Sequence, residues 1–290
     1  MKRNHRSRKS LFHTVCTYRS FLIIAITLLL IGSVAYSTCK NSQNSRNVSA
    51  ISDDAYLMEL TQVKTTNTPD GQMLNYPGFN VFFSNNHRQP YYSTWILTAQ
   101  HAQDKTFPRS DKFRPDPNVK NSAQLSDYRR SGYDRGHMAP SADFRYSREA
   151  QDATFFLTNM SPQHNSLNGR AWANLEDQCR NWAIRDGSIV IVTGPILSDK
   201  LSETIGENKI TVPARFFKVV LAPYADPPRA IGFIMPNQYV TGGVQATVTT
   251  VDEVEQITGF DFFSALPDDI EEVVESTSKY SVWQHSVKKK

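Results

Sequence analysis

Apolar residues recur at helical spacing in the middle of the chain, over residues 169–185. The positions concerned are Trp172, Leu175, Cys179 and Trp182. They lie three or four residues apart, as on one face of a helix with about 3.6 residues per turn. Gly187 follows, and glycine commonly ends a helix. The pattern therefore predicts an amphipathic helix over residues 169–185.

Several shorter runs are rich in apolar and β-branched residues and predict strands. These runs are 76–83, 91–98, 153–160, 188–193, 215–221 and 230–235. Short helices are expected at 55–60, 250–258 and 267–274. Because strands and helices mix without regular βα alternation, we expect an α+β fold with a mixed, mainly antiparallel central sheet flanked by helices.

The first 37 residues combine a basic head with an apolar run. Residues 1–19 carry six Lys and Arg and no acid, and residues 21–36 are uncharged and mostly apolar. This arrangement is typical of a cleaved signal or of a single membrane anchor. We therefore expect a periplasmic or extracellular protein, or one anchored to the membrane through residues 21–36. An acid-free basic head also fits a mitochondrial address, which is the alternative.

The rest of the chain divides by composition into a linker, one folded domain and a tail. Residues 38–73 are rich in Ser, Asn, Thr and Asp and are expected to form a polar linker. The folded domain is expected over residues 74–276, followed by a C-terminal tail at 277–290. The three cysteines make no disulfide framework. Cys179 is expected to be a small buried apolar residue.

The net charge of +4 does not by itself indicate a nucleic-acid partner. Six of the 32 Lys and Arg belong to the basic head, which leaves 26 against 28 Asp and Glu. Any phosphate-binding surface must therefore be local. Five arginines lie close together at positions 129, 130, 135, 145 and 148. They could follow a phosphate backbone, although the acids between them also fit an ordinary solvated surface.

The tetrapeptide Asp134-Arg135-Gly136-His137 carries the clearest chemistry. Histidine titrates near neutrality and can take a proton from an attacking water, although a lone histidine can also be purely structural. Alternate residues of a strand share one face, so Arg135 and His137 would point the same way. A guanidinium beside an imidazole suits a phosphate group. Asp134 would face the other way in a supporting role.

Asn168 and Glu176 lie at the beginning of the predicted helix. Asn168 could cap the helix or could ligate a hard cation through its amide oxygen. Glu176 lies about 80° farther around the helix, so both side chains could reach one site. Glu176 could instead form a helix pair with Arg180. One amide ligand leaves most positions to water, as Mg²⁺ prefers.

Three segments together resemble the DNA/RNA non-specific endonuclease family, the ββα-metal or His-Me finger group of endonuclease G-like nucleases. They are Asp134–His137, Asn159–Gln163 and Leu167–Glu176. The order and spacing of the segments, rather than any one of them, carry the resemblance, which extends over residues 76 to about 276. It implies a ββα-metal active-site motif within the α+β fold.

The resemblance also implies a role for each matching residue. His137 would be the general base, Asn168 the sole direct protein ligand of Mg²⁺ or Mn²⁺, and Glu176 the holder of metal-bound water. Arg135 would stabilise the phosphate, and Asn159 would lie near the scissile phosphate. A loop arginine would join them, for which Arg109 fits best and Arg114 is the alternative, and Arg180 would lie farther out.

These observations predict a Mg²⁺-dependent, sugar-non-specific endonuclease that hydrolyses phosphodiester bonds of DNA and RNA. No aromatic stacking array is evident, so recognition of particular base sequences is not expected. Two alternatives stay open. One is a catalytically inactive nucleic-acid-binding surface protein, and the other is a phosphodiesterase acting on smaller esters. The sequence does not indicate the oligomeric state.

Overall fold

The computed structural model describes residues 53–65, 69–120, 122–198 and 202–284. The basic head and the apolar run at 21–36 lie outside the described residues. Within the described residues, no helix is both long enough and apolar enough to cross a membrane. All features discussed below belong to one compact unit, Tyr56–Lys290.

A seven-stranded sheet forms the centre of the fold, with the strand order β12-β11-β10-β7-β4-β3-β2. Its strands are β2 (Gly71–Tyr76), β3 (Phe79–Ser84), β4 (Gln89–Thr98), β7 (Ser188–Ile196), β10 (Arg215–Ala222), β11 (Arg229–Pro236) and β12 (Val248–Thr249). Every neighbouring pair is antiparallel. The expected α+β class with a mainly antiparallel sheet is confirmed.

Three short two-stranded pairings accompany this sheet: β1 with β13, β5 with β6, and β8 with β9. Their bounds are β1 (Lys64–Thr65), β5 (Asp134–His137), β6 (Met160–Gln163), β8 (Thr204–Ile205), β9 (Ile210–Thr211) and β13 (Phe260–Asp261). The helices include α2 (Ala99–Gln103), α3 (Leu125–Tyr128), α4 (Arg148–Ala153), α5 (Ala173–Asp186), α6 (Val251–Thr258) and α7 (Asp268–Glu275), and a π-helix, η3 (Leu167–Trp172), leads into α5.

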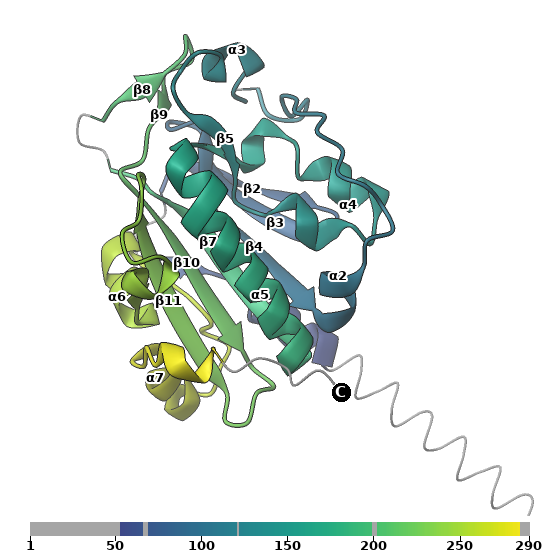
Figure 1. Ribbon diagram of the computed structural model, residues 1–290, viewed down its shortest axis with the longest axis vertical. Coiled ribbons are helices and arrows are strands. Elements are labelled where there is room, and N and C mark those ends of the chain that lie inside the picture. Colours follow the sequence, from purple (N-terminus) through teal and green to yellow (C-terminus); the bar gives the residue numbers. More distant parts are fainter. Residues whose placement is uncertain (1–52, 66–68, 121, 199–201, 285–290) are drawn as a thin grey trace, which may run out of the picture. The chain divides into compact units, whose positions relative to one another are not determined.

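Helices cover both faces of the sheet, and β7 shows why. Its residues alternate between two apolar clusters, with Ile189 and Ile191 in one and Val190 and Val192 in the other. Because side chains of a strand alternate in direction, an apolar run without polar gaps must be covered on both sides. Helix α5 packs on one face, where it crosses the strands in Figure 1, and α6 and α7 pack on the other.

Most predicted elements are confirmed, including the helix at 169–185 and the strands at 188–193, 215–221 and 230–235. The predicted strand 76–83 is instead the end of β2, a tight turn and β3. Gly78 makes this turn with φ +87°, and a Cβ there would lie 2.3 Å from the Tyr146 hydroxyl oxygen. Only glycine fits both requirements.

The predicted strand 153–160 is wrong. The chain there leaves α4, passes through a 3₁₀ turn at Leu157–Asn159 (η2) and enters β6 at Met160. Phe155 and Leu157 are fully buried. An apolar run of this length fits either a buried strand or a buried irregular segment, and periodicity alone does not separate them.

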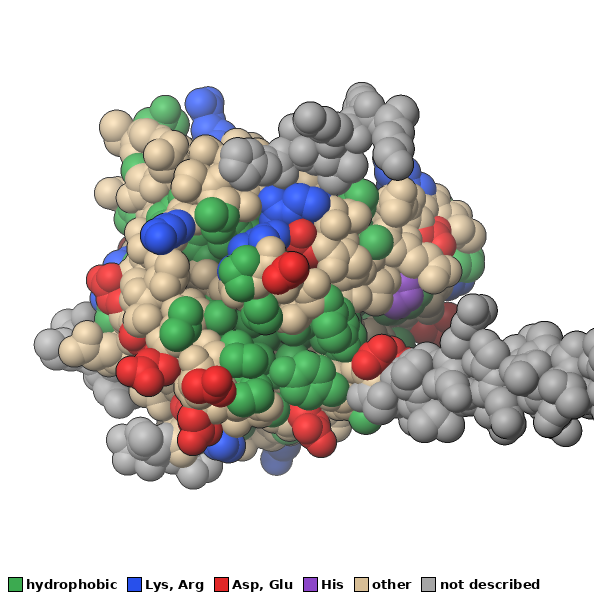
Figure 2. Space-filling view, turned by 90° about the horizontal axis from the view of Figure 1, so that it is seen from below, with side chains coloured by type: hydrophobic (Ala, Val, Ile, Leu, Met, Phe, Trp, Pro, Cys, Tyr) green, Lys and Arg blue, Asp and Glu red, His purple; other side chains and the backbone are tan. Residues whose placement is uncertain are grey.

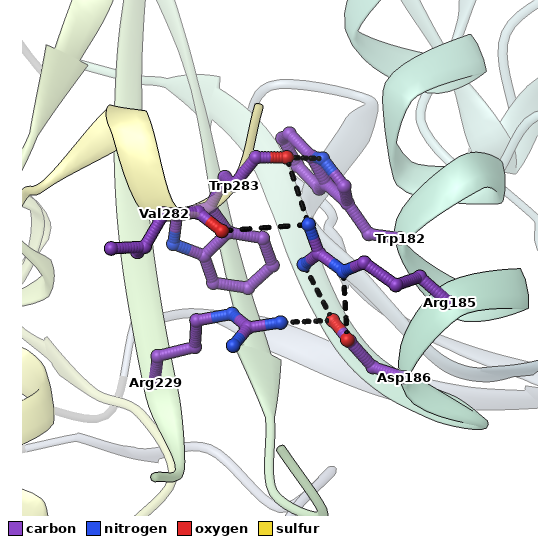
Figure 3. A network of polar contacts seen from close by, with 6 residues as sticks. All are labelled: Trp182, Arg185, Asp186, Arg229, Val282 and Trp283. Carbon is purple, nitrogen blue, oxygen red and sulfur yellow. Dashed lines mark hydrogen bonds and ion pairs between the residues drawn. The ribbon is translucent and has the colours of Figure 1, made fainter. Parts of the chain in front are cut away.

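The expected linker and tail boundaries also change. Leu57 and Leu60 are buried in the core, and β1 pairs with β13, so the fold begins well before residue 74. In the tail, Trp283 is only 2% exposed. Its carbonyl oxygen accepts hydrogen bonds from Trp182 Nε1 at 2.8 Å and from Arg185 at 3.0 Å (Figure 3). The tail therefore contributes a buried aromatic anchor to the fold.

Candidate active site

A cavity of about 630 Å³ brings most of the predicted site residues together. Its lining includes Arg109, Arg135, His137, Asn168 and Glu176. These residues come from the loop after α2, from β5, and from the η3–α5 segment. The arrangement of the β5–β6 ribbon followed by η3 and α5 matches the expected ββα motif in its order of elements.

Gly136 allows the two strands of the ribbon to approach closely. A Cβ at this position would lie 2.3 Å from Gln163 Oε1 and 2.6 Å from Gln163 Cβ. Any larger residue would therefore push β6 away from β5. In the paired ribbon, Arg135 is exposed, and His137 lies opposite Met160 and is 9% exposed.

Asn159 lies behind the site rather than in it. It is fully buried and does not line the cavity. Its Oδ1 accepts a hydrogen bond from the Ala139 amide at 3.0 Å, and its Nδ2 donates to the Ala139 carbonyl oxygen at 2.9 Å. The Met138 amide donates to the Asn159 carbonyl oxygen at 3.0 Å. Asn159 thus holds the chain directly after His137, instead of standing beside a phosphate as expected.

His137 lies in an apolar, positively charged environment. The rings of Phe113 and Phe155 meet the imidazole edge-on, with centroids 5.5 Å and 5.1 Å away. Burial, followed by the charges of Arg109 and Arg135, lowers the pKa of His137 to about 3. Its Nε2 is buried and has no hydrogen-bond partner among the described residues. The imidazole is therefore neutral at neutral pH and able to accept a proton.

The cavity distinguishes between the two candidate loop arginines. Arg109 lines it, and one guanidinium nitrogen donates to Ser141 Oγ at 2.7 Å. The guanidinium of Arg114 instead stacks 4.0 Å above the centre of the Phe156 ring, and Arg114 is not part of the lining. Arg135 lies 4.1 Å above the Phe113 ring. Arg109 and Arg135 therefore form the positive side of the cavity.

Asn168 is not a helix cap. It lies inside η3, whose N-cap residue is Ser166, and its backbone amide donates to His164 at 2.9 Å. The side-chain Nδ2 donates to Asp134 Oδ2 at 3.0 Å. This bond uses the nitrogen and leaves Oδ1 as the group available to a ligand. Short π-helical segments are frequent at functional sites.

Asp134 also lines the cavity, contrary to the expectation that it would face away. Its Oδ2 accepts hydrogen bonds from Asn168 and, at 3.2 Å, from Asn165 Nδ2. The carboxylate therefore orients the Asn168 amide, which agrees with a supporting role.

Glu176 is partly buried on the first turn of α5. Burial raises its pKa to about 7, although the charges of Lys218 and Arg180 oppose this. No hydrogen bond or ion pair to its carboxylate is found within the described residues. Arg180 pairs with Asp143 at 2.8 Å and with Asp177, so the alternative of a Glu176–Arg180 helix pair is not realised.

The donor set fits a hard divalent cation. Asn168 lines the cavity and keeps its amide oxygen for a ligand, and Glu176 lines it with a carboxylate that has no protein partner among the described residues. Neutral and anionic oxygens are the ligands that Mg²⁺ prefers, with the remaining positions filled by water. The partly buried Glu176 carboxylate would lose its cost of burial if a cation stood beside it.

Sequence reasoning missed Lys218, a lysine inside the apolar strand β10. The side chain is 1% exposed, with Nζ 4.5 Å from the centre of the Trp172 ring and 5.5 Å from that of Trp95. Its charge lowers the pKa of Glu176 against the effect of burial. A lysine in the middle of the run RFFKVVLA was the available signal, because lysine is almost never fully buried without a reason.

Comparison with known proteins agrees with this geometry. The family described as DNA/RNA non-specific endonuclease matches residues 58–269. "Nuclease 1, mitochondrial" of Schizosaccharomyces pombe is 34% identical over 210 residues, 66% of this chain and 65% of that protein. "Nuclease" of Nostoc sp. is 33% identical over 224 residues, 72% of this chain and 79% of that protein.

The fold comparison agrees as well. A chain in the crystal structure of the EndoG/EndoGI complex superimposes with a TM-score of 0.63 at 30% identity, covering 67% of this chain and 86% of that one. The resemblance noted in the sequence is thereby confirmed, and the chain belongs to the DNA/RNA non-specific endonuclease family.

Proposed function

We propose that this protein is a Mg²⁺-dependent, sugar-non-specific endonuclease that hydrolyses phosphodiester bonds in DNA and RNA. The observation that carries the proposal is the convergence of five side chains on one cavity. A neutral His137 stands beside Arg109 and Arg135, and Asn168 and Glu176 offer oxygen atoms for a cation and its water.

The proposed role of each residue follows from the chemistry of its side chain. His137, which lines the cavity, would take the proton of the attacking water. Arg109 and Arg135 would bind the phosphate oxygens and stabilise the charge that grows on them. Asn168 would ligate the cation directly and Glu176 would hold the water around it, and the cation when bound would stabilise the leaving oxygen.

The test is cleavage of supercoiled plasmid and of a structured RNA by the purified protein. We expect cleavage of both with Mg²⁺, none with EDTA, and a loss of about 10²- to 10⁴-fold for His137→Ala, the typical contribution of a general base. His101→Ala is the matched control, because His101 stacks on Tyr146 and does not line the cavity. Thermal unfolding of each variant would verify that it is folded.

Three outcomes would contradict the proposal. A folded protein that binds DNA without ever nicking it would support the inactive binding protein instead. Cleavage of a small chromogenic diester with no effect on polymers would support the phosphodiesterase alternative. Equal loss of activity in His137→Ala and His101→Ala would remove His137 from its proposed role.

We further propose that residues 21–36 direct the protein into or across a membrane, either as a cleaved signal or as an anchor. The uncharged run behind a basic head supports this. Relatives from Schizosaccharomyces pombe and Danio rerio have names that include "mitochondrial", which favours the mitochondrial address among the alternatives. Sequencing the N-terminus of the mature protein and fractionating cells would separate these outcomes.

A further inference from the structure

Three carboxylates meet where helices α6 and α7 pack against each other, on the sheet face opposite α5. Asp252 and Glu255 lie one turn apart on α6, and Glu275 is the last residue of α7. One carboxylate oxygen from each lies within 4.8 Å of the other two. Figure 2 shows the molecule from below the view of Figure 1, the end at which α7 lies, and acidic side chains surround an apolar patch on this face.

Glu275 differs from ordinary surface acids because its carboxylate is buried. The residue is 5% exposed, and its Oε1 is buried with no hydrogen-bond partner among the described residues. A buried acceptor without a partner is costly, and such groups are rare in folded proteins. One carboxylate oxygen of Glu275 lies within 4.8 Å of oxygens of Asp252 and Glu255, so the buried side chain is directed into a group of acceptors.

The charges around the cluster increase the repulsion. Besides Asp252 and Glu255, Asp261 and Glu271 act on Glu275, and all four raise its pKa in addition to the effect of burial. Lys64 acts on Glu271. In the part of the chain that the structure describes, no lysine or arginine forms an ion pair with Asp252, Glu255 or Glu275. One hydrogen bond, from the Phe262 amide to Glu255 Oε1 at 2.7 Å, offsets part of the charge.

We propose that Asp252, Glu255 and Glu275 form a binding site for Ca²⁺ that joins α6 to α7. Carboxylate oxygens are hard ligands and suit this cation. With Ca–O distances of about 2.3–2.6 Å, ligands on opposite sides of the ion stand up to about 4.6–5.2 Å apart, so oxygens within 4.8 Å of one another can share one ion. Ca²⁺ also accepts irregular coordination by flexible side chains, whereas Mg²⁺ demands near-ideal octahedral geometry. Asp252 is exposed, so water can complete the coordination.

A cation at this position would satisfy the buried Glu275 oxygen and cancel the repulsion between the helices. Because α6 and α7 follow each other in the chain and cover the same sheet face, the ion would tie the C-terminal part of the fold together. A ligand that binds only the folded state raises its stability. We therefore expect Ca²⁺ to stabilise the protein independently of the active-site cation.

Calorimetric titration of the full-length protein with Ca²⁺ tests this. To separate the two sites, titrations are performed on wild type and on Asn168→Ala, which removes the proposed Mg²⁺ ligand. We expect one Ca²⁺ site to persist in Asn168→Ala and its affinity to fall at least about tenfold in Glu275→Gln, as for loss of one charged ligand. Glu272→Gln is the matched control, because Glu272 is exposed on the same helix.

Thermal unfolding supplies a second measurement. Ca²⁺ should raise the Tm of wild type, of Asn168→Ala and of Glu272→Gln, but not that of Glu275→Gln. If Glu275→Gln does not fold, Asp252→Asn at the exposed position takes its place. Absence of binding in the millimolar range would overturn the proposal, as would a Ca²⁺ site that disappears in Asn168→Ala and survives in Glu275→Gln.

Discussion

The carboxylate of Asp134 offers a sharp test of how the cation ligand is held. Its Oδ2 accepts one hydrogen bond from Asn168 Nδ2 at 3.0 Å and another from Asn165 Nδ2 at 3.2 Å. The first bond fixes the Asn168 amide through its nitrogen and leaves Oδ1 for a ligand. The change Asp134→Ala removes this acceptor without touching the ligand itself.

The size of the effect can be worked out from the bond that is lost. A hydrogen bond to a charged group contributes about 1.5–3 kcal/mol. Removing a group that orients a metal ligand typically costs about 10- to 100-fold in metal affinity, which corresponds to about 1.4–2.8 kcal/mol. The free energy of the lost hydrogen bond and the free energy of the expected loss in metal affinity therefore agree. Asp134→Asn keeps an acceptor but loses the charge, which about halves the bond strength and places this variant near the tenfold end.

The assay is a Mg²⁺ titration of the initial rate of plasmid cleavage. We expect the half-saturating Mg²⁺ concentration to rise about 10- to 100-fold in Asp134→Ala, because the ligand is no longer oriented. The rate at saturating Mg²⁺ should fall much less. Asn165→Ala is the control, since it removes the other donor to the same carboxylate and leaves the bond to Asn168 in place.

Two results would refute this reasoning. The first is an unchanged Mg²⁺ dependence in a folded Asp134→Ala protein. The second is an equal shift in Asn165→Ala, which would mean that the whole loop, and not the Asn168 amide, responds to the change.

The loop arginine, the C-terminal tryptophan and the buried histidine each give a further prediction. Arg109→Ala should lower kcat/KM by about 10- to 100-fold, as expected for loss of a charged hydrogen bond to phosphate. Arg114→Ala should keep a kcat/KM near that of wild type, because the Arg114 guanidinium stacks on Phe156. Comparable losses in the two variants would contradict the assignment of Arg109 as the loop arginine. Trp283→Ala should reduce the free energy of unfolding in urea by about 3–5 kcal/mol, since a buried indole is deleted; a change below about 1 kcal/mol would mean that the tail is not part of the core. Saturating Mg²⁺ keeps Glu176 ionised. Under this condition, kcat/KM should show no fall near pH 6.5 from protonation of His137, because the pKa of His137 is lowered to about 3. Arg135→Gln removes one of the positive charges that lower this pKa and should move the acid limb to higher pH. If the acid limb of the pH profile does not move in Arg135→Gln, it reports the protonation of a group other than His137.

Prediction from the sequence succeeded for elements whose apolar pattern is strong and local. The helix over residues 169–185 shows its buried face through Trp172, Leu175, Cys179 and Trp182, and all four are buried. It failed for residues 153–160, where an apolar run proved to be a 3₁₀ turn leading into a short strand. The burial of Phe155 there reflects contact with His137, which no local pattern reveals.

The residues of the candidate site also fall into those that the sequence identified and those that it did not. The identities of His137, Asn168 and Glu176 and their order along the chain were enough to indicate their chemistry. The sequence favoured Arg109 over Arg114 without deciding between them, since both lie in one loop and differ only in where the loop turns. Asn159 shows a different limit. A polar residue in a motif can serve the site by hydrogen-bonding the backbone behind it, and composition alone does not separate this from contact with phosphate.

Residue identity and spacing were sufficient to indicate the family, the α+β class and the candidate base and cation ligand. These properties are local, and hydrophobic periodicity and side-chain chemistry translate them directly into elements and roles. The three-dimensional packing was needed to show that Asp134 orients Asn168, that the charge of Lys218 acts on Glu176, and that acids from α6 and α7 converge. Such interactions join segments that are distant in the chain, and they exist only once the sheet and its two layers of helices have packed together.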